Sequence, residues 1–158
     1  MHDLRMIPLD RLDHALLDLL QRDGTATSDS LGRRLGLSAS QAGRRRARLE
    51  AAGVVRGYGA RLDPAALGLG VQAFVQVQMA VHDPDAARPF GRVVELQPEI
   101  VAAWTLTGEA DYLLRIRCED LAALNRLIHE VILPHPAVSR VQSQIVMAEL
   151  KADAPLPI

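Results

Sequence analysis

The chain has 158 residues, 49% of them hydrophobic, which is enough for one large or two small domains with buried cores. A net charge of −1 is not typical of a protein that binds nucleic acid over its whole surface. The charge is uneven, however: residues 1–63 hold 11 Lys and Arg against 8 Asp and Glu, and residues 64–158 hold 7 against 11. We therefore expect a cationic head and an acidic body.

Several classes of protein are disfavoured by what the sequence lacks. Cys118 is the single cysteine, which excludes an intramolecular disulfide and a Cys-x-x-Cys metal site and favours the cytoplasm. The N-terminus has no apolar signal-peptide core, and no stretch approaches the ~18 apolar residues of a membrane span. The five histidines show no ligand or acid/base spacing, and no phosphate loop, nucleophile motif or carboxylate pair stands out. We expect no cofactor, no metal, no membrane contact and no enzymatic activity.

The first elements in chain order are a frayed arm over residues 1–8 and a helix of about a dozen residues. Asp10 is suited to cap this helix, and Asp23-Gly24 ends it. Leucines and alanines recur along it at helical spacing, which predicts one buried stripe.

The stretch from residue 27 to 53, TSDSLGRRLGLSASQAGRRRARLEAAG, predicts two short helices joined by a tight turn at 36–38. Gly36 can take the positive φ that ends a helix, and Ser38 with Gln41 can form a capping box at the start of the next. Gly32 leaves no side chain where two helices must cross closely. This pattern is typical of a helix-turn-helix whose second helix enters a DNA major groove.

The second of these helices has two distinct faces at about 100° per residue. Ala42, Leu49 and Ala52 fall on the inner face, and the outer face holds Ser40, Gln41, Arg44 and Arg48. Arginine on such a face can bind a guanine edge bidentately. Arg45 and Arg46 flank the inner side, so we expect one to be a structural ion-pair partner or to lie along the neighbouring backbone. The alternative is a solvated basic helix face, which the capped turn makes less favourable.

The segment from residue 54 to 62 predicts two short extended pieces around glycines, which is typical of a wing. Arg56 and Arg61 on it can reach phosphate. Residues 64–70 follow as a linker, so the DNA-binding domain is expected over 1–63. The DNA-contact candidates are Ser38, Ser40, Gln41, Arg44, Arg45, Arg48 and Arg56.

From residue 71 the hydrophobic period changes to two, which predicts a strand to about residue 81 with one buried face. Its other face carries Gln72, Phe74, Gln76 and Gln78 and suits a partner surface better than open water. The remaining expected elements are a turn at His82-Asp83-Pro84, a helix over 85–96, strands over 101–107 and 112–118, a helix from Asp120 to about Pro134, and a strand over 138–150. The order β-α-β-β-α-β is the ferredoxin-like arrangement, expected over 71–151, with 152–158 as a tail.

Motifs in both halves resemble one family. The head motifs are Leu9-Asp10-Arg11-Leu12-Asp13, Asp23-Gly24, Leu37-Ser38, Arg44-Arg45, Arg48-Leu49-Glu50, Gly53-Val54-Val55 and Tyr58, and the hairpin motif is Thr107-Gly108-Glu109-Ala110-Asp111-Tyr112-Leu113-Leu114. In this order and spacing, over residues 9–151, the chain resembles the Lrp/AsnC family of feast/famine transcriptional regulators. The fold class that follows is α+β, with an N-terminal winged helix-turn-helix joined to a ferredoxin-like domain.

The resemblance implies that the head binds double-stranded DNA as a homodimer and that the second domain dimerises through its sheets and assembles further, often into octamers. It also implies an amino acid or related small effector near the glycine hairpin. The effector residues that the resemblance implies are Thr105, Thr107, Gly108, Asp111, Tyr112 and Ser143. An ordinary hairpin turn, with glycine for positive φ and aspartate for a side-chain turn bond, is the alternative for this loop.

Three residues depart from the family pattern. Arg46 replaces an apolar helix residue, Gly43 weakens its helix by roughly 1 kcal/mol relative to alanine, and Ser30 replaces a glutamate. Two other functions stay open at this point. One is a DNA-organising protein of the same fold that binds no effector. The other is an enzyme like the sirohaem decarboxylases, although the expected histidine-asparagine-tyrosine cluster has no counterpart in residues 101–107.

Overall fold

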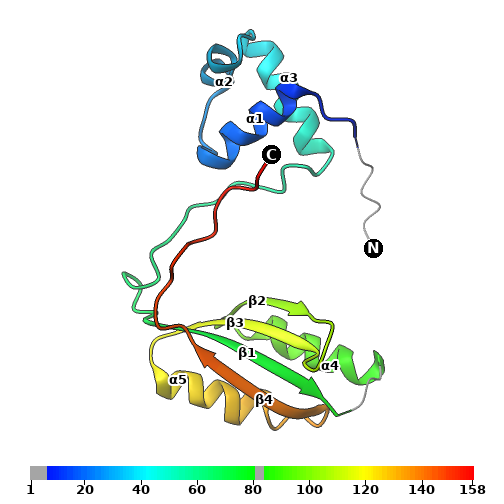
Figure 1. Cartoon of the computed structure of the whole chain (residues 1–158), viewed down its shortest axis with the longest axis vertical. Coiled ribbons are helices and arrows are strands. Elements are labelled where there is room, and N and C mark those ends of the chain that lie inside the picture. The colour runs from blue at the N-terminus through cyan, green and yellow to red at the C-terminus, as the bar shows by residue number, and fades with distance from the viewer. Residues whose placement is uncertain (1–6, 81–83) are drawn as a thin grey trace. The chain divides into compact units, whose positions relative to one another are not determined.

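The structure, a computed structural model, describes residues 7–80 and 84–158 and divides into two compact units (Figure 1). The first unit comprises Met1–Arg61 with Lys151–Ile158, and the second comprises Leu62–Leu150. Residues 1–6 of the expected arm lie outside the described residues, as do Val81, His82 and Asp83 of the expected strand end and turn. None of the helices in the described part of the chain is long and apolar enough to cross a membrane.

The first unit contains three capped helices, α1 (Arg11–Arg22), α2 (Ser28–Leu35) and α3 (Ala39–Ala51). A capping box formed by Asp10 and Asp13 begins α1, and the Thr27 hydroxyl accepts a hydrogen bond from the backbone of Ser30 to begin α2. The predicted capping box at α3 is confirmed: Ser38 Oγ accepts from the Gln41 N–H at 3.2 Å, and Gln41 Oε1 accepts from the Ser38 N–H at 2.9 Å. Each box satisfies backbone donors that a helix start leaves unpaired.

Two glycines allow the tight turn between α2 and α3. Gly36 has a φ of 68°, the left-handed conformation that glycine adopts without steric cost. A Cβ on Gly32 would lie 2.6 Å from the carbonyl oxygen of Leu37 and 3.2 Å from the nitrogen of Ala39. The close crossing predicted from Gly32 is therefore confirmed, and it is a crossing of α2 with the backbone that opens α3.

The core of the first unit is aliphatic and small. Its buried residues are Leu16, Leu17, Leu20, Ala26, Leu31, Ala42 and Leu49. Leu35 packs against this cluster, whereas Leu37 is only half-buried and lies at the turn. Leu17 joins the core because α1 turns a wide apolar stripe inward.

The predicted wing is not formed. Residues 54–62, all of them described, contain no strand. Gly57 and Gly59 disfavour a strand, and side-chain contacts hold the segment against α3 instead. The Tyr58 hydroxyl donates a hydrogen bond to Glu50 Oε1 at 2.8 Å, and the Arg46 guanidinium carbon lies 4.6 Å from the centroid of the Tyr58 ring. The first unit is thus a helix-turn-helix with an irregular segment in the wing position.

The second unit has the predicted β-α-β-β-α-β order. Its elements are β1 (Val71–Met79), α4 (Pro84–Leu96), β2 (Ile100–Thr105), β3 (Tyr112–Cys118), α5 (Leu121–Arg126), a π-helical turn η1 (Leu127–Ile132) and β4 (Val138–Ile145). The strands form one antiparallel sheet in the order β2-β3-β1-β4, and Asp120 caps α5 as expected. The ferredoxin-like prediction is confirmed.

Strand β4 is shorter than predicted, since it ends at Ile145 and not at residue 150. Ala73 pairs with Ile145, and the N–H of Val146 donates the next hydrogen bond to the carbonyl of Gln72 at 2.9 Å. Because β1 begins at Val71, the ladder has no further partner for β4. Apolar residues alone do not extend a strand past the end of its neighbour.

The two faces of the sheet differ. Helices α4 and α5 cover one face of the sheet (Figure 1). The core lies on this face, and Val75, Val77, Leu114, Ile116 and Phe90 are fully buried in it. The opposite face, here called the open face, carries the alternate side chains of the same strands. It contains Gln72, Phe74, Gln76 and Gln78 of β1, Trp104 of β2, Leu113, Arg115 and Arg117 of β3, and Arg140, Gln142 and Gln144 of β4.

Candidate nucleic-acid interface and effector hairpin

Burial along α3 confirms which face of this helix points outward. Ala42 and Leu49 are completely buried against α1 and α2. Ser40, Gln41, Arg44 and Arg48 are exposed on the other side. The helix after the tight turn therefore presents short polar and arginine side chains to the outside, as the sequence predicts.

Three of the four arginines of α3 line a depression of about 370 Å³. Its lining consists of Asp10, Leu37, Gln41, Arg44, Arg45 and Arg48. Leu37 lines this depression and is half-buried there, outside the core of the first unit. The depression joins the start of α1 to the outer face of α3, and all of its cationic side chains come from α3.

A buried carboxylate on α1 holds two of these arginines. Asp13 is fully buried, and its Oδ1 accepts a hydrogen bond from Arg45 at 2.8 Å. Its Oδ2 pairs with Arg48, and Arg45 also reaches Asp10 at 2.7 Å. The Asp10 N–H donates to Asp13 Oδ2 at 3.0 Å, so the capping box of α1 and the ion pairs of α3 share one carboxylate.

Titration of Asp13 reflects this arrangement. Burial alone would raise the pKa of Asp13, but the Asp10 N–H and the guanidinium groups of Arg48 and Arg45 outweigh it and lower the pKa to about 2. The hydrogen bonds of Arg45 to the carboxylate of Asp10 and, second, to that of Asp13 raise the pKa of Arg45. Both groups stay charged at neutral pH, and α3 is fastened to α1 by a partly buried ionic cluster.

Arg46 has a structural role that also explains its departure from the family pattern. Its Nε donates to Glu50 Oε1 at 2.9 Å and an Nη donates to the carbonyl of Ala26 at 3.0 Å. The guanidinium also stacks on the Tyr58 ring. The Arg46 side chain therefore links α3 to the segment before α2 and to the segment that follows α3. Of the two arginines that flank the inner side, both form ion pairs, Arg45 with Asp10 and Asp13 and Arg46 with Glu50, and Arg46 also binds the neighbouring backbone.

The other DNA-contact candidates differ in how they are engaged. Ser38 Oγ and Gln41 Oε1 are used in the capping box, a bond that does not involve the NH₂ group of Gln41. Ser40 is exposed in the first turn of α3. Arg56 lies away from this cluster, because it lines a groove between α1 and residues 53–58.

The effector candidates on β2 and β3 lie on and around one hairpin. Thr105 and Tyr112 are cross-strand partners at its base, and Thr107 and Gly108 lie in the connection. Gly108 has a φ of 116°, a conformation that side-chain-bearing residues rarely adopt. The hairpin thus groups five of the six candidates, with two exposed threonine hydroxyls.

Asp111 is tied to the end of β1. Its Oδ2 accepts a hydrogen bond from the Met79 N–H at 2.7 Å, next to a register irregularity between Gln78 and Met79. Its N–H donates to the Val77 carbonyl at 3.0 Å, and its own carbonyl accepts from Leu106 at 2.8 Å. The carboxylate that the resemblance assigns to an ammonium group therefore has a structural bond as well.

Tyr112 and Ser143 lie on the helix-covered side of the sheet. The Tyr112 ring lies 5.1 Å from that of Phe90 and is part of the packed core. Ser143 of β4 pairs with Val75 of β1, and β4 and the hairpin strand β2 form opposite edges of the sheet. Within one chain the structure does not bring Ser143 to the hairpin. Ser143 lines a separate groove of about 350 Å³ beside α5 and η1.

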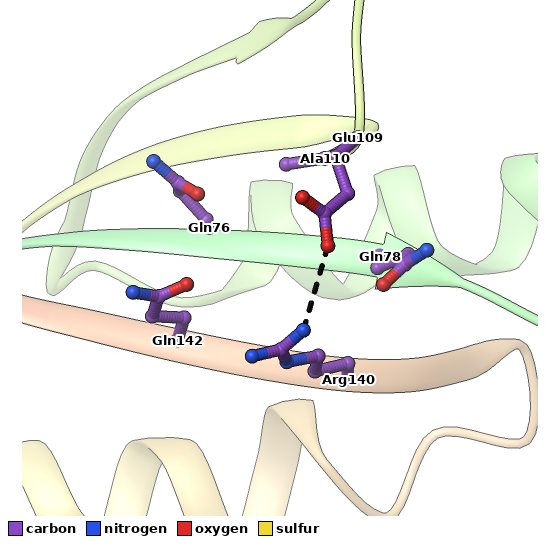
Figure 2. A pocket seen from close by; sticks show the side chains of 6 residues that line it. All are labelled: Gln76, Gln78, Glu109, Ala110, Arg140 and Gln142. Atoms are coloured by element: carbon purple, nitrogen blue, oxygen red, sulfur yellow. Dashed lines mark hydrogen bonds and ion pairs between the residues drawn. The ribbon is translucent and has the colours of Figure 1, made fainter.

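The tip of the hairpin contacts a different set of residues, which the sequence did not single out as a site. Figure 2 shows Glu109 and Ala110 above the open face, where they and four side chains of β1 and β4 surround a cavity of about 40 Å³. Glu109 Oε1 lies 3.4 Å from an Nη of Arg140. The other three side chains are Gln76, Gln78 and Gln142. The alternating glutamines indicated this face, but the lean of the hairpin over β1 has no sequence signal.

Comparison with known proteins agrees with this architecture. Residues 9–50 match the model of the AsnC-type helix-turn-helix domain, and residues 72–156 match the Lrp/AsnC ligand binding domain. The chain is 36% identical to the glutamate uptake regulatory protein of Zymomonas mobilis over 150 residues, which are 95% of this chain and 91% of that protein. It is 35% identical to the leucine-responsive regulatory protein of Escherichia coli over 143 residues, 90% of this chain and 87% of that protein.

A solved structure is also closely similar. A transcriptional regulator of Neisseria meningitidis, in a complex with L-Met, matches with a TM-score of 0.90 and 38% identity over 95% of this chain and 97% of that one. The relatives are transcriptional regulators, in line with the expectation that the chain is not an enzyme. The chain belongs to the Lrp/AsnC family of transcriptional regulators.

Proposed function

We propose that the chain binds a specific duplex DNA sequence through the outer face of α3 and that an amino acid or related small molecule bound by the second unit modulates this binding. The observation that carries the proposal is the capped helix α3, with Ser40, Gln41, Arg44 and Arg48 exposed along one side. A helix held rigidly at its N-terminus presents such side chains to base edges in a fixed register.

The α3 side chains divide into two roles. Arg44 is exposed at the depression and is our candidate for direct base contact, together with Ser40 and the NH₂ group of Gln41. Arg45 and Arg48 already use part of their guanidinium donors on Asp13, so we assign their remaining N–H groups to phosphates, which a single donor can bind. Ser38 and Arg56 are further phosphate candidates.

The test is DNA affinity after Arg44→Ala, measured with an operator selected from random duplexes. We expect a loss of about tenfold or more in specific affinity, since a good bidentate contact contributes about 1–3 kcal/mol. Arg92→Ala on the exposed side of α4 removes the same charge from the second unit and serves as the control. Equal affinities of the two variants and the unmodified protein would refute the proposed role of α3.

Salt dependence gives an independent measure of the phosphate contacts. Each neutralised phosphate contributes about −0.9 to the slope of log K against log salt concentration. We expect a slope of several units that becomes shallower in Arg48→Ala. A slope near zero would show that the arginines do not neutralise phosphates.

For the effector, we propose an α-amino acid near the 105–112 hairpin. The proposal is supported by the positive φ of Gly108, by the nearby threonine hydroxyls, and by the L-Met complex of the Neisseria meningitidis relative. A ligand that binds only the folded state raises the melting temperature. We would measure melting with each of the common amino acids, L-methionine included. If none raises it, a DNA-organising role without an effector replaces this part of the proposal.

We also propose that two copies associate through the open face and that further assembly, up to an octamer, follows. A dimer would present two α3 helices about 34–36 Å apart, one turn of DNA. Gln76 and Gln142 are cross-strand neighbours on this face. Replacing both with glutamate would place like charges on the two copies, and sedimentation equilibrium should then report a smaller species than for the unmodified chain. An unchanged mass would exclude the open face as the interface.

A further inference from the structure

Residues 151–158, Lys-Ala-Asp-Ala-Pro-Leu-Pro-Ile, lie with the helix-turn-helix unit although they follow the second unit in sequence. The end of this segment has few backbone hydrogen-bond donors. Pro155 and Pro157 have no N–H, and each proline restricts its own φ and the residue before it to extended conformations. Leu156 between them is therefore held extended and supplies the single amide donor of this tripeptide.

The side chain of Gln21 engages both backbone groups of Leu156. The Leu156 N–H donates to Gln21 Oε1 at 2.6 Å, and Gln21 Nε2 donates to the Leu156 carbonyl at 3.2 Å. A carboxamide offers one acceptor and a donor side by side, so it pairs with an extended residue as a neighbouring strand would. Gln21 lies in the last turn of α1 and is half-buried.

An apolar groove of about 610 Å³ surrounds this contact. Its lining includes Leu9, Leu17, Leu20 and Val55, and Leu156 and Ile158 of the segment itself. Leu156 remains 70% exposed and Ile158 53% exposed, so the aliphatic side chains lie along the groove without filling it. The contact thus depends largely on the Gln21 hydrogen bonds, and little apolar area opposes its release.

We propose that this groove is a docking site for an extended, proline-flanked aliphatic peptide and that its ligand is the chain's own segment 151–158. Docking is reversible and needs no high affinity, because the covalent connection keeps the segment at a high effective concentration. Since residues 146–150 lead directly from β4 to the segment, docking connects α1 to the second unit by a route other than residues 62–70. Helix α1 also carries Asp13, which holds Arg45 and Arg48 of α3.

Amide hydrogen exchange of the full-length protein, followed by NMR, tests the proposal. We expect the Leu156 amide to exchange at least about tenfold more slowly than in an unstructured peptide, and to lose this protection in Gln21→Ala. Arg22→Ala is the matched control on the same turn, because Arg22 pairs with Asp18 of the same helix, whereas Leu156 pairs with Gln21. Unprotected Leu156 in the unmodified protein, or equal protection in Gln21→Ala, would overturn the proposal.

A variant in the segment itself tests the same contact without changing α1, so a folding defect in this helix cannot produce the result. Leu156→Pro removes the N–H that donates to Gln21 and changes no residue of the helices. We expect the Gln21 side-chain NH₂ resonances to shift toward those of a solvated glutamine, while the amides of α1 and α3 keep their positions. Gln21 resonances that are unaffected by Leu156→Pro would exclude the docking site. None of these measurements involves DNA, so their failure would leave the proposed function intact.

Discussion

Arg48 on α3 forms an ion pair with Asp13 on α1, so the helix that we propose to bind DNA is anchored through one of its own outward side chains. The Arg48 side chain is 47% exposed, and that of Asp13 is 1% exposed. One end of the pair is therefore accessible to a phosphate while the other end lies in the interior. Removing either partner should affect folding stability and DNA binding together, which makes matched variants necessary.

Asp13→Asn should make the stability of the first unit less dependent on acid pH. The folded-state pKa of Asp13, about 2, lies below its ordinary value of 3.8, so the ionised carboxylate contributes stability that is complete above about pH 4. This contribution, about 2 kcal/mol, is lost as the pH falls from about 4 to 2. The protection of α1 and α3 amides from hydrogen exchange, relative to an unstructured chain at the same pH, should therefore fall more steeply with acid in the unmodified protein than in the variant.

Asp18→Asn is the control for this measurement. Asp18 forms an exposed i,i+4 pair with Arg22 on the same helix, and such pairs contribute little to stability. Its exchange profile should follow that of the unmodified protein down to pH 2. Parallel acid profiles for Asp13→Asn and the unmodified protein would contradict the importance of the buried carboxylate.

Arg44→Ala and Arg48→Ala should separate DNA binding from stability. Arg48→Ala leaves the buried carboxylate of Asp13 with one charged partner fewer, which we expect to cost about 1–2 kcal/mol. Arg44 is exposed at the depression, so its loss should change stability by less than about 0.5 kcal/mol. Exchange rates in α3 measure the first effect. Equal rates in the two variants would mean that Asp13 and Arg48 are not coupled.

Gly32→Ala and Gly43→Ala should shift the melting temperature in opposite directions. A Cβ on Gly32 would lie 2.6 Å from the backbone oxygen of Leu37, so the turn must move, at a cost of about 1–3 kcal/mol. A Cβ on Gly43 would lie 3.2 Å from Ser28 Oγ, which can rotate away, and alanine gains up to about 1 kcal/mol of helix propensity. Thermal unfolding of the two variants checks this, and a stabilised Gly32→Ala protein would contradict the close crossing.

The sequence predicts the local elements of this fold well because their signals are local. The capping residues Asp10, Ser38 and Asp120 each mark a helix start within a few residues of sequence, and the period-2 alternation of β1 identifies both faces of the sheet. The wing prediction at 54–62 was wrong because glycine spacing resembles that of a hairpin, whereas the conformation depends on side-chain contacts of Tyr58 with Glu50 and Arg46 of α3, which the spacing does not indicate.

The sequence predicts which side chains of α3 point outward, but not which of them form ion pairs with α1. Helical periodicity alone places Arg44 and Arg48 outside. It cannot indicate that Arg48 returns to Asp13, 35 residues earlier, because that contact depends on how α1 crosses α3. Ser143 shows the same limit: its strand was predicted, but Ser143 faces the helix-covered side of the sheet, whereas the hairpin tip leans over the open face to Arg140 and Gln142 of the same strand.

Asp111→Asn and Asp111→Ala should distinguish a structural role of this carboxylate from a ligand contact. Asp111 Oδ2 accepts from the Met79 N–H at 2.7 Å, and asparagine keeps an acceptor oxygen there while alanine removes it. Met79 should therefore stay protected from hydrogen exchange in Asp111→Asn and lose about 1–2 kcal/mol of protection in Asp111→Ala. If the charge also binds an effector's ammonium group, Asp111→Asn alone should abolish the melting shift caused by that amino acid. A shift that persists in Asp111→Asn would restrict Asp111 to holding the hairpin against β1, and equal Met79 exchange in all three proteins would dismiss even that bond.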